Sequence, residues 1–412
     1  MILLSHPFGN ANVRAVLDAL QESELLARYV TALGWSNHAR WLQLLPDSMR
    51  AKLVRRAYKI PSAKMQLEPA REITRLLAGD SSLARQLVEH ERGWASIDQV
   101  WRSVDQAAAR YLRACAGTGE IRGIYAYEDC ARDSFRVARD LGVRRIYDLP
   151  IAYYATAQRL LHEEAGRYPD WEPTLGGTRD STEKLARKAE ELELAELIVC
   201  PSAFVFDSVP AQTRAAKPCV VVPFGSPAVV AAEPARRTGT LRVLFAGAMT
   251  QRKGLADLFA AMQLISRTDV ELVVMGSLLR PLDWYRERCA RFTYEPPRPH
   301  AQVLRLMGSC DVFVLPSIVE GRALVQQEAM ACGLPLIATK NAGGDDLIVE
   351  GETGFLVPIR SPEVLAEKIS WCADNREAIC GMRIAAQRRA AELTWRDYGQ
   401  KVLAAIRSTT GE

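Results

Sequence analysis

The sequence has few histidines and no closely spaced cysteines. Its five histidines stand apart from one another, and its nine cysteines are scattered between Cys115 and Cys380 without a Cys-x-x-Cys pair. Zinc sites and disulfide frameworks both depend on closely spaced residues of these types, so the pattern disfavours both. We therefore expect reduced thiols, a cytoplasmic protein and no metal centre.

Long hydrophobic runs and an excess of one charge are also missing. The longest uncharged apolar stretch, 219–232, is interrupted by Pro223, Gly225 and Pro227, whereas a membrane-spanning helix needs about 20 apolar residues. The first residues, Met1–Ser5, lack a basic leader, so we expect no signal peptide. With 53 basic and 49 acidic residues, the chain lacks the dense basic stripe of a nucleic-acid binder, and we expect no nucleic-acid partner.

The composition is that of a folded protein with more than one core. The 412 residues are 48% hydrophobic and 25% charged, and a domain usually contains about 100–200 residues. In the second half, buried-type strands alternate with helical patterns, which predicts a parallel sheet in an α/β fold. The strands are expected near 241–247, 271–276, 311–316, 334–338 and 354–357.

The first half follows the same alternation less regularly. We expect an N-terminal domain over 1–230, with a helical insertion at about 35–116, and a second domain over 231–394. A last helix at 395–412 is expected to cross back to the first domain. Chemistry in parallel sheets occurs at the carboxyl ends of the strands, so the site should lie in the cleft between the domains.

Two glutamates follow the strand that begins at Asp311. Glu320 lies in the loop after the strand and Glu328 on the next helix, eight residues later. A rise of 1.5 Å per residue lets both face one ligand about 7–9 Å apart. The amides of Arg322–Val325 at the helix start attract an anion, and carboxylates beside an anion site suit sugar hydroxyls. This combination indicates a nucleotide-sugar site; the alternative is an exposed loop glutamate and a surface helix glutamate.

A second candidate segment, 245–254, also joins a strand to a helix. Gly247 permits a tight turn, and Arg252 and Lys253 place two cations where a diphosphate leaving group needs neutralising. The alternative is a solvated basic turn. A third segment, 292–297, contains Tyr294 at a position where a base can stack, although a proline-rich connector explains the pattern equally well.

Together these stretches resemble glycosyltransferase family 4, the group 1 glycosyltransferases, which are retaining enzymes of the GT-B fold. The resemblance rests on the flanks of the two glutamates (LPSIVEG and QEAMACGLPLIA), on the Arg252-Lys253-Gly254 turn and on GETGFLVP at 351–358. It covers about 150 residues of the second half. In the first half, VCPSAFVFDS at 199–208 and VVPFG at 221–225 look like the closing strands of the family's first domain.

The resemblance implies two Rossmann-like parallel-sheet domains facing a central cleft, and retaining transfer of a hexosyl or other sugar from a nucleotide-diphosphate sugar. Arg252, Lys253 and Glu320 are then catalytic, with the cations on the diphosphate and Glu320 on the sugar hydroxyls, while Glu328 contacts the ribose. The implied donor-binding residues are Gly247, Gly276, Tyr294, Ser317, Gly321, Arg322, Ala323, Leu324, Val325 and Glu328.

On the acceptor side, the resemblance points to Gly9 and Asn10 in the first loop. It also points to Asp148 or Tyr153, in a segment where relatives carry a histidine. For the last two, a strand-end aspartate and a core tyrosine are the alternative. The implied acceptor is a glycan or a lipid-linked saccharide, in polysaccharide or glycolipid biosynthesis.

The sequence contains no Asp-x-Asp triplet, with which other glycosyltransferases hold a divalent metal. Negative charge on the departing diphosphate would then be stabilised by fixed cations and helix-terminal amides. We therefore expect a metal-independent enzyme without a cofactor.

A basic amphipathic helix is predicted over 49–60. Lys52, Arg55, Arg56 and Lys59 recur at helical spacing, and such a helix can lie on an anionic membrane surface. This would place the protein at the inner face of the membrane; the alternative is a surface helix packed on the first domain.

Two other functions share the expected fold. One is a non-catalytic nucleotide-sugar-binding protein, and the other is a GT-B epimerase or phosphorylase. The joint presence of Arg252, Lys253 and both glutamates favours the transferase.

Overall fold

The computed structural model describes residues 1–37, 56–78, 82–229 and 239–410. The first half of the chain forms a seven-stranded sheet in the order β5-β2-β1-β6-β7-β8-β9, and all its neighbouring strands are parallel. Its strands are β1 (Ile2–Ser5), β2 (Leu26–Thr31), β5 (Met65–Leu67), β6 (Gly123–Tyr127), β7 (Arg144–Asp148), β8 (Leu197–Cys200) and β9 (Cys219–Val221).

The second half forms a six-stranded parallel sheet in the order β12-β11-β10-β13-β14-β15. Its strands are β10 (Leu241–Ala246), β11 (Val270–Met275), β12 (Thr293–Glu295), β13 (Val312–Leu315), β14 (Leu336–Thr339) and β15 (Gly354–Val357). In both sheets the first strand lies inside and the order reverses beside it, as in the Rossmann fold. The expected fold class, two Rossmann-like parallel sheets, is confirmed.

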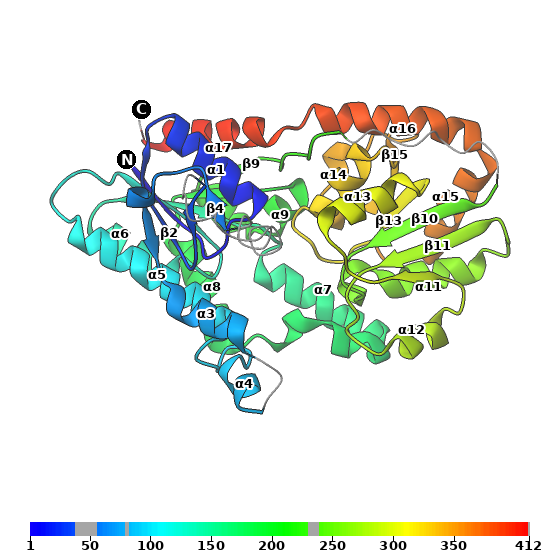
Figure 1. The fold of residues 1–412 in the computed structure, drawn as a ribbon, viewed down its shortest axis with the longest axis horizontal. Helices are drawn as coiled ribbons and strands as arrows, with labels where there is room; N and C mark the ends of the chain where they lie inside the picture. The colour runs from blue at the N-terminus through cyan, green and yellow to red at the C-terminus, as the bar shows by residue number, and fades with distance from the viewer. Residues whose placement is uncertain (38–55, 79–81, 230–238, 411–412) are drawn as a thin grey trace.

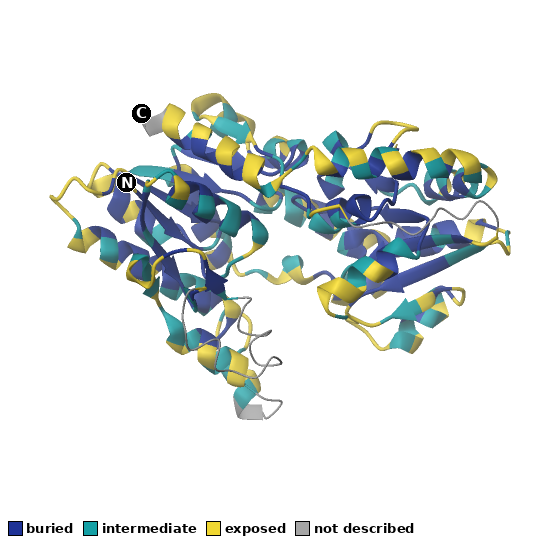
Figure 2. Ribbon diagram, turned by 45° about the horizontal axis from the view of Figure 1, so that its top comes forward, coloured by how far each residue is buried: buried dark blue, intermediate teal, exposed yellow. Residues whose placement is uncertain are grey.

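The central strands form because their side chains are apolar on both faces. All four residues of β13 and five of the six in β10 are buried, which is the pattern of a sheet covered by helices on each side. Figure 2 shows the strands of both halves as buried and the outer helix faces as exposed.

Helices cover both sheets. Those of the first half are α1 (Ala11–Glu22), α3 (Pro69–Leu77), α4 (Ser82–Leu87), α5 (Ile97–Ala114), α6 (Arg132–Asp140), α7 (Tyr154–Arg167), α8 (Thr182–Leu194), α9 (Ala203–Ser208) and α10 (Ala211–Ala216). Those of the second half are α11 (Leu255–Leu264), α12 (Leu282–Arg288), α13 (His300–Gly308), α14 (Leu324–Ala331), α15 (Pro362–Asp374), α16 (Arg376–Ala391) and α17 (Trp395–Thr410). Within the described residues, no helix is both long and apolar enough to span a membrane.

The predicted helical insertion at about 35–116 is only partly helical. It contains the short paired strands β3 (Trp35–Ser36) and β4 (Ala57–Tyr58). It also contains β5, which forms an edge of the first sheet. These strands escape sequence reasoning because they are two or three residues long, too short to show a period.

The predicted basic helix over 49–60 is wrong in its last part, where β4 occupies residues 57–58. Lys52 and Arg55 lie outside the described residues. Arg56 forms an ion pair with Glu72 at 2.5 Å, and Lys59 Nζ lies 3.8 Å from the carboxylate of Asp18. These two cations therefore neutralise the protein's own carboxylates and do not extend a helical basic face.

Besides the link between β9 and β10, two segments of the described chain extend from one half to the other. Helix α17 packs along α1, and Figure 1 shows it running back over the first sheet. In the opposite direction, α7 and the 3₁₀ turn η3 (Pro169–Thr174) reach the second half, where Trp171 packs in the core against Phe259, Trp284 and Tyr285. Sequence alone assigned this segment to the first domain.

Candidate functional site

The topology of the second sheet brings two distant loops together. β10 and β13 are neighbours, so the turn after β10 and the loop after β13 leave the same edge of the sheet. A Cβ on Gly254 would lie 2.0 Å from the carbonyl oxygen of Pro316, so the loops are in direct contact there. This edge, where the strand order reverses, is the position at which open α/β sheets bind ligands.

Arg252, Lys253 and Glu320 converge at this edge. Arg252 and Lys253 belong to the 3₁₀ turn η5 (Gln251–Lys253). Arg252 Nη1 lies 3.0 Å from Glu320 Oε1 and donates to the Val319 carbonyl at 3.0 Å. Lys253 Nζ contacts the same Oε1 atom. The predicted catalytic residues are thus placed side by side, although Lys253 and Glu320 are 67 positions apart in sequence.

Charge in this trio favours a bound anion. Burial alone would raise the pKa of Glu320, but Lys253 and Arg252 together hold this pKa below its ordinary value. Burial lowers the pKa of Lys253, and Glu320 opposes that shift. Two cations share one carboxylate, which leaves one net positive charge in a pocket where water screens it poorly.

Gly247, Gly276 and Tyr294 lie in a row along the same edge. Gly247 has φ of +149°, and a Cβ on it would lie 2.8 Å from Lys253 Cδ. A Cβ on Gly276 would lie 1.7 Å from the Gly247 carbonyl oxygen. The hydroxyl of Tyr294 donates to the Gly276 carbonyl at 3.1 Å. The glycines are therefore needed so that the lysine stem and two backbones can approach one another.

The start of α14 differs in part from the predicted anion site. The Ala323 amide donates to the Ala342 carbonyl at 3.1 Å, so it is not free for a ligand. The guanidinium of Arg322 is buried and ion-pairs with Asp346, with Nη1 2.5 Å from Oδ1. Within the described residues, the backbone amides of Arg322, Leu324 and Val325 have no acceptor. Only part of the predicted amide set thus remains available.

Ser317 and Gly321 both lie in the buried loop after β13. The hydroxyl of Ser317 is fully buried and has no hydrogen-bond partner among the residues that the structure describes. Gly321 contacts the first half, because a Cβ on it would lie 1.7 Å from the Pro150 carbonyl oxygen. Its own carbonyl accepts from the Ser202 hydroxyl at 2.6 Å. The loop that contains Glu320 therefore belongs to the second half and is in direct contact with the first half.

Glu328 does not join the trio. Its Oε1 lies 3.1 Å from Nε2 of His300, the first residue of α13, and its side chain is 24% exposed. The ribose contact implied for Glu328 stays a prediction.

The acceptor-side residues are placed differently from one another. A Cβ on Gly9 would lie 2.5 Å from Tyr58, whereas Asn10 is exposed before α1. Asp148 and Tyr153 are buried. Asp148 accepts from the Tyr125 hydroxyl at 2.6 Å, and burial raises its pKa to about 7, opposed by that bond. Asp148 thus has the surroundings of a core residue, and an acceptor role for these four residues stays a prediction.

A cavity of about 510 Å³ lies between the halves beside the trio. Helix α7 contributes Tyr154, Ala157 and Leu161 to its wall, and the second half contributes Arg252 and Val319. The cavity is open to the catalytic candidate Arg252 on one side and lined mainly by the first half on the other. Sequence reasoning did not identify α7 as a cavity wall, because its spacing does not distinguish a lining face from a packed one.

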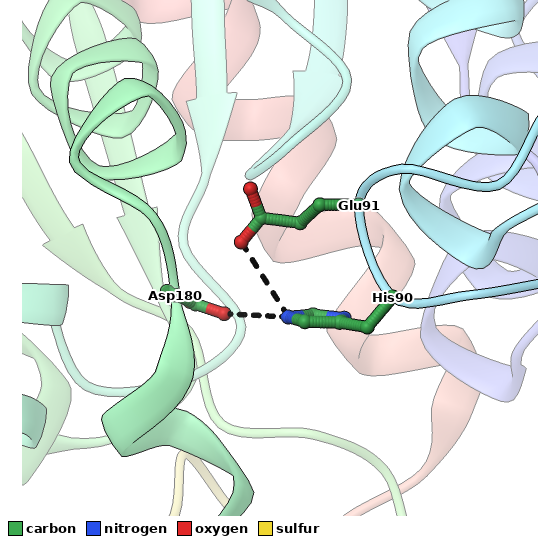
Figure 3. Close-up of side chains that lie close together, drawn as sticks. All are labelled: His90, Glu91 and Asp180. Carbon is green, nitrogen blue, oxygen red and sulfur yellow. Dashed lines mark ion pairs between the residues drawn. The ribbon is translucent and has the colours of Figure 1, made fainter.

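His90, Glu91 and Asp180 form a cluster near the rim of this cavity. Figure 3 shows His90 between the two carboxylates, with Nε2 3.5 Å from Glu91 and 3.4 Å from Asp180. The three could hold a metal by proximity. However, Asp180 Oδ1 already binds the Lys184 ammonium at 2.9 Å, and Glu91 accepts from the Ser181 amide at 2.9 Å. The carboxylates of this cluster are thus already engaged by groups of the protein itself.

The match to a known protein family lies in the second half of the chain. Residues 240–375 match the family described as glycosyl transferases group 1. D-inositol 3-phosphate glycosyltransferases are similar over part of the chain. The protein from Paenarthrobacter aurescens is 28% identical over 39% of this chain and 42% of its own length. The protein from Mycobacterium bovis is 34% identical over 30% of this chain and 26% of its own length. The matches thus span about a quarter to two fifths of these relatives.

Solved structures resemble the whole chain in fold. Sucrose-phosphate synthase from Thermosynechococcus elongatus has a TM-score of 0.67 at 17% identity, over 100% of this chain and 99% of its own. Anabaena HepE in complex with UDP has a TM-score of 0.62 at 15% identity, over 99% of both chains. The chain therefore has the GT-B fold, and its residues 240–375 match a group 1 glycosyl transferase domain, in agreement with the predicted resemblance to glycosyltransferase family 4.

Proposed function

We propose that this protein is a retaining glycosyltransferase that moves a hexosyl or other sugar from a nucleotide-diphosphate sugar to a glycan or lipid-linked acceptor, in polysaccharide or glycolipid biosynthesis. The observation that carries the proposal is the convergence of Arg252 and Lys253 on Glu320 at the edge where β10 and β13 end. The names of the similar proteins, which include HepE bound to UDP-glucose, agree with such a donor.

In this proposal the two cations neutralise the diphosphate, and the free Leu324 and Val325 amides at the start of α14 add to the positive field. When the anomeric carbon–oxygen bond breaks, the electron pair stays on the departing phosphate oxygen, where charge develops. Glu320 accepts hydrogen bonds from hydroxyl groups of the sugar and keeps its ion pairs with both cations. The acceptor occupies the cavity lined by α7, which opens beside Arg252.

The proposed reaction needs no metal, because the leaving-group charge is met by fixed cations. A thermal-shift panel of UDP-, GDP- and ADP-sugars in the presence of EDTA tests the donor directly. Binding to the folded state raises the melting temperature, so we expect one nucleotide class to stabilise the protein with EDTA present. A shift that needs added Mg²⁺ or Mn²⁺ would overturn metal independence, and no shift with any donor would overturn the proposed function.

A further inference from the structure

Two fully buried carboxylates next to the proposed site bind one amide side chain. Glu164 comes from α7 and Asp257 from α11, and neither is exposed to solvent. The Nε2 atom of Gln251 donates to Glu164 Oε2 at 2.6 Å and to Asp257 Oδ2 at 2.9 Å. Its Oε1 atom accepts from the Ala256 amide at 2.8 Å. Gln251 is itself fully buried and directly precedes the two cations of η5.

Each carboxylate is neutralised by an arginine. Arg167 Nη1 lies 2.6 Å from Asp257 Oδ1, and Arg360 Nε contacts Glu164. Arg360 has φ of +61°, a left-handed conformation that a side chain of this size adopts only when its surroundings hold it there. Buried charges are tolerated when they are paired and hydrogen-bonded, and such a satisfied network is rigid.

The backbone of the same turn is held from the first half as well. The Thr174 hydroxyl accepts from the Gln251 amide at 3.3 Å, and the Thr250 hydroxyl donates to the Thr174 carbonyl at 2.7 Å. The Thr250 hydroxyl also accepts from the Arg252 amide at 3.1 Å. The α7–η3 segment thus forms hydrogen bonds with both the side chain and the main chain of the η5 turn, at the residues that directly precede the proposed diphosphate cations.

We propose that Glu164 is a positioning residue for the Arg252–Lys253 turn, acting through Gln251. Without the carboxylate, Gln251 loses a buried acceptor, and the turn can rotate so that both cations leave the place where the diphosphate sits. Because α7 also lines the cavity, one first-half helix then serves the acceptor cavity and the donor cations together. The role in donor binding rests on the proposed function, whereas the ordering of the turn does not.

The test compares Glu164→Ala with the matched control Glu163→Ala. Glu163 is the adjacent residue on α7 and pairs with the same Arg360, with Oε2 2.8 Å from Nη1. It is 39% exposed, and its ion-pair partners in the described part of the chain are Arg159 and Arg360. Two quantities are measured on the full chain. One is hydrogen exchange of the amides of 247–256, and the other is affinity for UDP, GDP and ADP by calorimetry.

We expect Glu164→Ala to speed exchange in 247–256 about tenfold and to weaken nucleoside diphosphate binding by a similar factor, which is the usual effect of leaving one buried donor unpaired. Glu163→Ala should change neither quantity by more than about twofold, because an exposed ion pair contributes little. Glu164→Gln keeps an oxygen that accepts from Gln251, so it should restore both quantities to within about threefold of the parent.

Unchanged exchange in 247–256 for a folded Glu164→Ala would overturn the proposal, as would equal effects of Glu163→Ala. If Glu164→Ala does not fold, Gln251→Met removes the amide side chain through which Glu164 acts, and an unchanged exchange rate of the 247–256 amides in that variant would overturn the proposal. If the parent binds none of the three nucleotides, the proposed function fails, and the exchange measurement still decides whether Glu164 orders the turn.

Discussion

Replacing Lys253 by methionine tests the charge argument for the candidate site. Methionine keeps a flexible apolar stem to lie over Gly247, but it removes the ammonium that contacts Glu320. Arg252 still pairs with Glu320 at 3.0 Å, so the carboxylate is not left alone. The trio then falls from one net positive charge to none, while its shape is nearly preserved.

The expected loss follows from the contact that disappears. A hydrogen bond between charged groups contributes about 1.5–3 kcal/mol, which corresponds to about 10–150-fold in affinity. The Lys253 side chain is only 11% exposed, so water does not replace the lost ammonium fully, and the upper part of the range is expected. Binding of the bare nucleoside should change little, because the lost charge faces the phosphates.

Calorimetry measures how tightly each variant binds two compounds. One is the nucleoside diphosphate that stabilises the parent protein, and the other is the same nucleoside without phosphates. Lys340→Met is the control, because Lys340 is 55% exposed and pairs with Asp207 at 3.0 Å on the surface. A folded Lys253→Met protein that binds the diphosphate as tightly as the parent would refute the reasoning. So would an equal loss for the nucleoside alone, because the defect would then lie elsewhere than at the phosphates.

Three further predictions test the packing around the site and in the core. Gly247→Ala should cost about 1–3 kcal/mol of stability and weaken diphosphate binding, because its Cβ would lie 2.8 Å from the Lys253 stem. Gly142→Ala, with φ of +68° and open space around its Cβ, should show the strain without the binding loss. Burial raises the pKa of Asp148 to about 7 from an ordinary 3.8. The folded state therefore holds a proton that the unfolded state releases, and urea unfolding should show stability falling from pH 4 to pH 7 by up to about 4 kcal/mol. Asp148→Asn should remove that part of the slope, and an unchanged slope would contradict the assignment. Trp171→Ala should lower the free energy of unfolding by about 3–5 kcal/mol, and a loss below about 1 kcal/mol would mean that η3 is not anchored in the second core.

Most of the second sheet was predictable because its strands are largely apolar runs; β12 at Thr293–Glu295 is no such run, since its residues are polar or aromatic and partly exposed. Runs such as 241–246 and 312–315 are buried on both faces, so hydrophobicity alone marks them. β2 at Leu26–Thr31 was not predicted, since Arg28 and Tyr29 interrupt its apolar pattern. The short strands β4 and β5 form through pairing with distant partners, which no local pattern records.

The candidate site was predictable wherever residues follow a strand directly. Arg252, Lys253 and Glu320 were singled out from two such loops, and the neighbouring positions of β10 and β13 bring them together. The Ala323 amide, by contrast, is bonded to the distant Ala342 carbonyl, which spacing along one helix does not reveal. Glu164 carried no signal either, because a glutamate on a helix is normally solvent-exposed.

The order of apolar and glycine residues along this chain was enough to determine an α/β protein with two parallel sheets and a cationic turn facing an acidic loop. Tertiary structure alone decided that α7 and Trp171 cross into the second half, that Glu164 accepts a hydrogen bond from Gln251 of the cationic turn, and that a cavity opens beside Arg252. The physical reason is range: local patterns encode which face of a strand or helix is apolar, whereas buried polar contacts depend on partners that only folding brings together.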